Sequence, residues 1–213
     1  IRDLVRSRGL GDVYKRQREY LTLDELNKLA NTPCERDVLK RAALFSALTG
    51  LRHCDIQKLK WNEIAIEGNQ AKLLFTQKKT KGVEYMPISE QAFKLCGEPR
   101  QPEQLVFEGL PNPSWISRPL RAWIEKAGIQ KHLSFHCFRH TFATLQLANG
   151  TDIYTVSKML GHTNVKTTQV YAKVVDEKKN NDYFNAHCID ALSYQFVRSG
   201  QMECNLSNIY RPI

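Results

Sequence analysis

The sequence HCFRHTFATLQLANG, residues 136–150, has the apolar period of an α-helix and carries two histidines four residues apart. On a helical wheel with His136 at zero, three apolar side chains fall between about 180° and 240°, a stripe that we expect to be buried. These side chains are Phe138, Phe142 and Leu145. His140 and Arg139 fall at about 40° and 300°, next to His136. The stretch therefore predicts a helix with a packing stripe and, on the other side, a separate polar edge.

Three interpretations of this polar edge are open. His136 and His140 share a helix face and could together bind a metal. A zinc site needs a third ligand, however, and Cys137 stands where the metalloprotease pattern has its glutamate. Arg139 would repel a metal ion and attract a phosphate, so a phosphate-facing edge is the favoured interpretation. A solvated helix edge is the third.

The composition narrows the class of partner. The chain of 213 residues has a formal net charge of +9, which favours nucleic acid over an anionic membrane surface, with solubility alone as a further explanation. No apolar run approaches the roughly 20 residues of a membrane span, and the first residues do not form a secretory signal. The six cysteines are scattered without a CxxC pair, which is typical of reduced thiols in a cytoplasmic protein.

Outward from residues 136–150, the periodicity predicts helices, one small sheet and more helices. A capping box of Thr22 and Glu25 begins one helix, and Gly50 ends the next. Three short strand-like runs follow, and Ser134 and Asn164 are candidate helix caps. The expected helices are 22–32, 36–50, 54–61, 89–97, 114–128, 136–150, 152–161 and 164–174, and the expected strands are 63–67, 71–77 and 83–89. In the helix 114–128 the buried side would hold Ile116, Leu120, Trp123 and Ile124. This order predicts a mainly α domain with a small three-stranded antiparallel sheet.

The two ends of the chain differ from this pattern. Residues 1–17 have neither a helical nor a strand period, and we interpret them as a non-native or disordered arm. The tail, residues 181–213, has apolar residues at four-residue spacing that allow one last amphipathic helix. They are Phe184, Cys188, Leu192 and Phe196. We therefore expect one domain over residues 18–180.

Four motifs in order resemble the tyrosine recombinases, the phage-integrase family. HCFRHTFAT (136–144), LGH (160–162) and a tyrosine nine residues later are similar to the family's C-terminal signature. Upstream, TGLRHCDI (49–56) resembles the first arginine box, and QKKTKGVEYMPI (77–88) resembles the β-hairpin that carries a lysine. Each motif alone is weak, but the ordered set is specific. The resemblance covers Glu19 to Lys179 and looks closest to integrases of conjugative transposons and prophages.

The resemblance implies a role for each matching residue. Tyr171 would be the nucleophile, forming a 3′-phosphotyrosyl intermediate, although its valine-rich surroundings also fit an ordinary core aromatic. Two arginines would clamp the phosphate oxygens, a lysine would protonate the leaving oxygen, and one histidine would orient or deprotonate the tyrosine. A second histidine would donate a hydrogen bond to the phosphate. The two arginines are Arg52 and Arg139, and the lysine is Lys79. The histidine that orients or deprotonates the tyrosine is His136, and the histidine that donates to the phosphate is His162.

Other residues would support this set. The resemblance implies that Asp55 props the first arginine and that His140 gives structural support. Lys78 and Lys81, beside the matched lysine, would contact DNA, and a hairpin tip that touches only the DNA backbone is the simpler alternative. No cofactor or metal is required by these steps.

The resemblance also implies partners. They are double-stranded recombination sites, a homotetramer on two such sites, and accessory DNA-bending proteins, in a bacterial cytoplasm and with no membrane association. Family members carry an N-terminal DNA-binding domain, for which this chain has no room, so we expect a fragment with a complete set of catalytic residues. The alternatives are a DNA-binding fragment without catalysis, a type IB topoisomerase-like enzyme that relaxes DNA, and, more distantly, a metal-dependent hydrolase.

Overall fold

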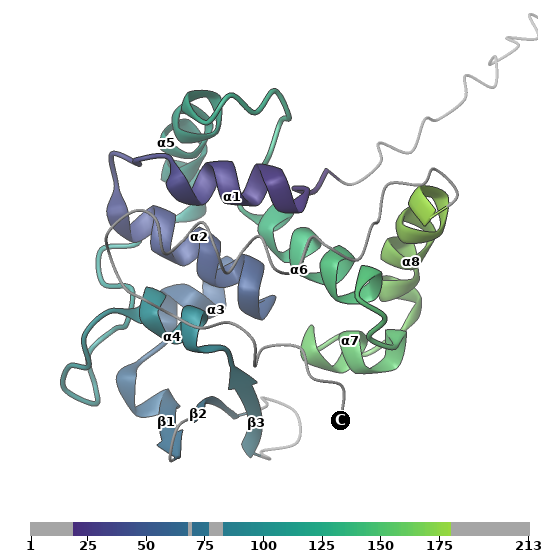
Figure 1. The fold of residues 1–213 in the computed structure, drawn as a ribbon. Coiled ribbons are helices and arrows are strands. Elements are labelled where there is room, and N and C mark those ends of the chain that lie inside the picture. The colour runs from purple at the N-terminus through teal and green to yellow at the C-terminus, as the bar shows by residue number, and fades with distance from the viewer. Residues whose placement is uncertain (1–18, 68–69, 77–82, 180–213) are drawn as a thin grey trace, which may run out of the picture.

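The computed structural model describes residues 19–67, 70–76 and 83–179, and over these ranges a group of packed helices carries one small sheet at one end (Figure 1). α2 and α6 lie side by side through the middle, α1 and α5 lie on one side, and the sheet lies at the opposite end. The elements are α1 (Leu23–Asn31), α2 (Asp37–Thr49), α3 (His53–Lys58), the 3-10 turn η1 (Trp61–Glu63), β1 (Ile64–Glu67), β2 (Gln70–Thr76), β3 (Val83–Ile88), α4 (Glu90–Cys96), α5 (Pro113–Lys126), α6 (His136–Ala148), α7 (Ile153–Met159) and α8 (Lys166–Lys179). The predicted mainly α fold with three strands is confirmed.

Most of the predicted helix signals are present. Thr22 Oγ1 accepts a hydrogen bond from the Glu25 amide, and the Glu25 carboxylate accepts one from the Thr22 amide, so the capping box begins α1. α2 ends at Gly50, which has a left-handed φ of 73°. The prediction that Ser134 caps α6 is wrong. The cap position is Phe135, and the Ser134 hydroxyl lies 3.4 Å from the Cys137 sulfur instead.

The sheet is antiparallel with the strand order β1-β2-β3. Leu73 of β2 is paired with Ile64 of β1 on one side and with Met86 of β3 on the other. Leu73 is fully buried, and Ile64 and Met86 pack against the main hydrophobic core. The sheet is therefore held to the helices by one apolar face, which is the usual arrangement of a small antiparallel sheet.

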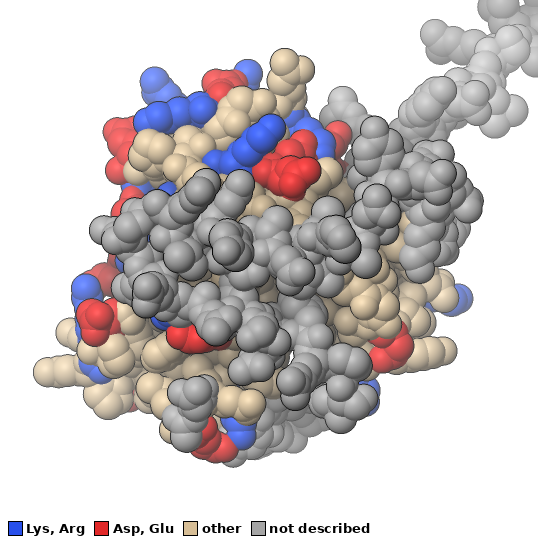
Figure 2. Space-filling model, viewed as in Figure 1, with Lys and Arg blue, Asp and Glu red and all other residues tan. Residues whose placement is uncertain are grey.

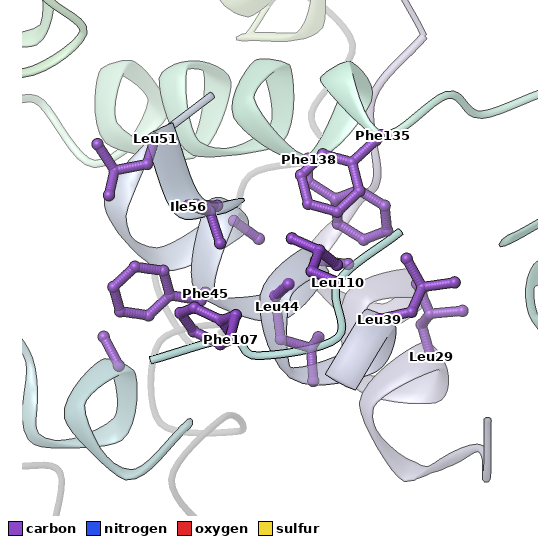
Figure 3. Close-up of a cluster of buried hydrophobic side chains, with 14 of the residues drawn as sticks. Leu29, Leu39, Leu44, Phe45, Leu51, Ile56, Phe107, Leu110, Phe135 and Phe138 are labelled. Atoms are coloured by element: carbon purple, nitrogen blue, oxygen red, sulfur yellow. The ribbon is translucent and has the colours of Figure 1, made fainter. Parts of the chain in front are cut away.

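The main hydrophobic core includes a cluster of buried side chains that joins α1, α2 and α3 to the start of α6 and to the segment holding Phe107 and Leu110 (Figure 3). The Phe45 and Phe107 rings lie 5.1 Å apart, and the rings of Trp123 and Phe138 stack at 6.3 Å. Phe138, from the predicted stripe of α6, is fully buried, which stabilises the fold by about 1.5–3 kcal/mol. All four predicted α5 core residues are also buried, namely Ile116, Leu120, Trp123 and Ile124.

The other side of α6 differs from the sequence prediction in one respect. His136 is exposed, as expected for a polar edge, but the side chains of Arg139 and His140 are 3% and 8% exposed. This edge is covered because α7 and α8 pack against α6. The side chains of Arg139 and His140, which the sequence predicted to face solvent, are thus enclosed by protein.

The surface of the described residues carries charges of both signs. Figure 2 shows Lys and Arg next to Asp and Glu over α1 and α5, where Lys131 pairs with Glu25 and Arg121 with Glu125. Within the described ranges no helix is both long and apolar enough to span a membrane. The described cysteines are free thiols, as predicted, and Cys188 and Cys204 lie outside the described residues. The arm 1–17 and the helix predicted in the tail lie outside them too, so the domain boundaries stay predictions.

Candidate active site

A buried guanidinium lies at the centre of the predicted site. Arg139 Nη1 donates to the Gly50 carbonyl at 2.7 Å, and Nη2 donates to the Leu160 carbonyl and lies 3.2 Å from His162 Nε2. Burial, reinforced by the nearby charge of Arg52, lowers the pKa of Arg139 to about 10. Among the described residues its hydrogen-bond partners are two carbonyls and an imidazole, and the charge of Asp55 offsets that of Arg139 only in part. Such a group favours binding of an anion.

Gly50 is required at its position for two reasons. Its φ of 73° is in the left-handed region, where a side chain is strained. A Cβ there would also lie 2.6 Å from Cδ1 of Phe142, well inside van der Waals contact. The end of α2 can therefore approach α6 closely, which brings the Gly50 carbonyl to the Arg139 guanidinium.

His162 is held by hydrogen bonds at both ring nitrogens. Its Nε2 faces the Arg139 guanidinium, which can only donate, so we assign Nε2 as the acceptor and Nδ1 as the protonated nitrogen. Nδ1 lies 2.8 Å from the hydroxyl oxygen of Thr168 in α8. The His162 amide donates to the Ser157 carbonyl at the end of α7. These contacts fix the imidazole beside the buried arginine.

Tyr171 is enclosed at the same place. Its side chain is 3% exposed, in a small apolar cluster that includes Phe142 and Leu160. The tyrosine oxygen lies 2.7 Å from Nδ1 of His140, and the His140 ring meets the His136 ring edge-on at 4.5 Å. The ring of Tyr171 is thus a core aromatic, while its hydroxyl belongs to the polar site. The histidine at hydrogen-bond distance is the one predicted to give structural support.

Arg52 occupies the cap position of α3. Its side chain is 46% exposed, and its Nη1 lies 4.0 Å from the Asp55 carboxylate, so the predicted pair is present but loose. An exposed pair at this distance contributes little stability. Arg52 is close enough to lower the pKa of Arg139, so two guanidiniums approach one another with one of them open to solvent.

The structure brings five of the six residues predicted as catalytic to the junction of α3, α6, α7 and α8: Arg52, His136, Arg139, His162 and Tyr171. The sixth, Lys79, and its neighbours Lys78 and Lys81 lie outside the described residues. Within the described ranges no group of three Cys, His, Asp or Glu side chains could hold a metal ion. Sequence reasoning missed two groups that orient site residues, the Gly50 carbonyl and the Thr168 hydroxyl, and neither has a signal in the sequence.

Comparison with known proteins identifies the family. Residues 19–178 match the model of the phage integrase family. The chain belongs to this family. A tyrosine recombinase of Pseudothermotoga lettingae is 32% identical over 178 residues, which cover 78% of this chain and 60% of that protein. The chain spans about three fifths of the length of the curated relatives that it matches.

Solved structures of phage-integrase relatives share the fold. The recombinase XerH, in a post-cleavage complex with a palindromic difH substrate, has a TM-score of 0.60 and 18% identity, covering 78% of this chain and 52% of that one. The catalytic domain of bacteriophage HP1 integrase has a TM-score of 0.52 and 24% identity, covering 72% of this chain and 86% of that one. The predicted fold, that of a tyrosine-recombinase catalytic domain, is therefore confirmed.

Proposed function

We propose that this chain is the catalytic part of a site-specific DNA recombinase, which cleaves and rejoins DNA strands through a 3′-phosphotyrosyl intermediate without a metal ion. One observation carries the proposal. The hydroxyl of Tyr171 is hydrogen-bonded to an imidazole of α6, and one residue before that histidine stands Arg139, a buried arginine whose hydrogen-bond partners in the described ranges are two carbonyls and His162. A nucleophile, a proton acceptor and an anion site thus lie together, which is the combination that covalent phosphoryl transfer requires.

Binding of the phosphate would rest on the two arginines. Arg139 is fixed by the Gly50 and Leu160 carbonyls, and its charge would stabilise a non-bridging oxygen as negative charge develops in the transition state. Arg52, more exposed, would bind the second non-bridging oxygen. His162 Nε2, which lies beside the Arg139 guanidinium, would donate a hydrogen bond to the phosphate once it carries a proton.

The proposed chemistry is a phosphodiester exchange. The oxygen of Tyr171 forms a bond to phosphorus while the bond from phosphorus to the 5′-oxygen breaks. The tyrosyl proton passes to Nδ1 of His140, and the 5′-oxygen receives a proton from Lys79. A free tyrosine has a pKa near 10, so only about a thousandth is ionised at neutral pH. His140 Nδ1, 2.7 Å from the tyrosine oxygen, would take up the proton as that oxygen attacks phosphorus. His136 would orient the acceptor through its ring contact.

A 5′-hydroxyl from a second DNA strand would reverse the step and join the strands. The proposed partners are double-stranded recombination sites, further copies of the chain in a tetramer on two sites, and accessory DNA-bending proteins, in a bacterial cytoplasm. XerH, whose fold this chain shares, was solved with its difH substrate, and the Tn1549 transposon integrase was solved with a circular intermediate DNA, which supports DNA as the partner. The net charge of +9 supports it independently.

Covalent trapping on a suicide duplex tests the function. The substrate is a 5′-labelled DNA duplex that contains the recombination site, with a nick near the scissile phosphate. After cleavage the short fragment diffuses away, and the protein stays attached to the labelled strand. We expect an SDS-resistant adduct that survives EDTA and is lost in Tyr171→Phe. Duplex binding without an adduct would instead indicate a DNA-binding fragment, and relaxation of supercoiled DNA without exchange between two sites would indicate a topoisomerase. A cut that EDTA prevents, with no adduct, would contradict tyrosine chemistry.

A further inference from the structure

His53, the residue after Arg52, links three parts of the site. It is the first residue of α3, and its Nε2 lies 3.0 Å from the carbonyl oxygen of Pro111. Its ring meets the ring of Phe135 edge-on, with 4.9 Å between centroids and 84° between the planes. Phe135 immediately precedes His136. One imidazole therefore connects the start of α3 both to the segment before α5 and to the start of α6.

A second side chain of α3 makes a parallel connection. Gln57 donates from Nε2 to the Leu110 carbonyl at 3.1 Å and lies 2.9 Å from Oδ1 of Asn112, the residue that precedes α5. The Arg52 side chain itself makes a loose 4.0 Å contact with the Asp55 carboxylate. The position of the Arg52 backbone therefore depends on the residues on its two sides. Before it, the buried Leu51 accepts a hydrogen bond from the Ser46 hydroxyl at 2.7 Å. After it comes α3, whose attachment nearest to Arg52 is His53.

The hydrogen bonding of His53 defines its protonation state. A carbonyl oxygen can only accept, so Nε2 carries the proton. Nδ1 is buried, and it has no hydrogen-bond partner among the described residues. Protonation would place an unpaired N–H at this buried atom, and burial accordingly lowers the pKa of His53. The imidazole is thus suited to act as a fixed neutral connector rather than as a proton donor to DNA.

We propose that His53 is a positioning residue for the phosphate clamp, holding Arg52 in place relative to His136 and the scissile phosphate. This proposal rests on the recombinase function proposed above. Its effect should appear in the chemical step more than in DNA affinity, because a small displacement of a clamping group weakens transition-state stabilisation before it weakens binding.

The test compares two substrates that differ in charge. In one suicide duplex the scissile phosphate is natural, and in the other a methyl group replaces one non-bridging oxygen, which gives a neutral methylphosphonate. The neutral group needs less compensation by a guanidinium, so loss of Arg52 should matter much less on it. If His53 acts through Arg52, its variants should show the same dependence on the substrate.

The variants separate the hydrogen bond from the ring. His53→Phe keeps an aromatic ring against Phe135 and removes the donor to Pro111. Tyr154→Phe is the control, because the Tyr154 side chain is 68% exposed and has no part in the phosphate clamp. We expect His53→Phe to slow adduct formation on the natural phosphate by about tenfold or more, with duplex affinity within about threefold. On the methylphosphonate, and in an Arg52→Ala background, the same change should have little further effect.

Each result decides the proposal. An equal loss on both substrates, or an effect that multiplies with that of Arg52→Ala, would mean that His53 acts only through general stability and would overturn it. A His53→Phe rate equal to wild type would overturn it as well, while leaving the recombinase function intact. No adduct from the wild-type protein on either substrate would overturn both the function and this role. The free energy of unfolding of each variant is measured in urea, so that a loss of stability can be told apart from a slower chemical step.

Discussion

The hydrogen bond between Tyr171 and His140 gives the most quantitative prediction. The 2.7 Å contact joins α8 to α6, and both side chains are buried. Tyr171→Phe removes the hydroxyl and nothing else, so the apolar packing of the ring is preserved. His140→Ala removes the other partner, and the double variant completes a thermodynamic cycle that isolates the interaction between the two groups.

The expected magnitudes follow from this burial. A hydrogen bond of this kind contributes about 0.5–1.5 kcal/mol to the free energy of unfolding. Removing one partner costs about 1–3 kcal/mol when the other is left buried without a hydrogen bond. We expect Tyr171→Phe to lower the free energy of unfolding by about 1–2 kcal/mol, or Tm by about 2–8 °C in a domain of this size. His140→Ala should cost more, because it also leaves a cavity. The coupling energy should be about 1 kcal/mol.

Urea titrations followed by far-UV circular dichroism measure all four proteins. Tyr154→Phe is the matched control, because the Tyr154 side chain is 68% exposed and its change should stay within about 0.5 kcal/mol. Additive losses, with a coupling energy below about 0.3 kcal/mol, would refute the contact in solution. The assignment of His140 as the proton acceptor would then lose its structural basis.

Three further changes test other parts of the site. Gly50→Ala should be destabilising by more than Gly128→Ala, since both have left-handed φ but only the Gly50 methyl would meet Phe142, and equal losses in urea would argue against the close approach. Arg139→Lys keeps the charge but loses the planar fork, so we expect adduct formation to fall about 100-fold or more, and a rate within threefold of wild type would contradict the clamp. The pKa of His53 is lowered in the folded state, so as pH falls through about 6.5 the unfolded chain takes up a proton first and stability is lost. His53→Phe should therefore show a shallower loss of stability than wild type between pH 7 and pH 5, and parallel profiles would contradict the buried neutral imidazole.

Features that depend on neighbouring residues could be predicted from the sequence. The capping box of Thr22 and Glu25 and the stop at Gly50 each involve residues within one turn, and the α5 core positions follow from helical period alone. The order of three short strands between helices was also enough to predict an antiparallel sheet. The motif resemblance added the site residues, and the five catalytic candidates that the structure describes lie at one junction.

Contacts between distant elements could not be predicted in the same way. His140 and Tyr171 are separated by 31 residues, and a helical wheel does not show that α7 and α8 cover the edge that holds His140. For the same reason His53 had no assigned role, since its partner Pro111 is 58 residues away. The role of Lys79 stays a prediction from the resemblance alone.

The most direct test of the central claim is to identify the covalently modified residue. After trapping on the suicide duplex, the adduct is digested with nuclease and protease, and the modified peptide is sequenced by mass spectrometry. The proposed chemistry predicts a single nucleotide remnant attached through its 3′-phosphate to the oxygen of Tyr171, formed equally well in EDTA. Modification of any other side chain, or attachment through a 5′-phosphate, would contradict it.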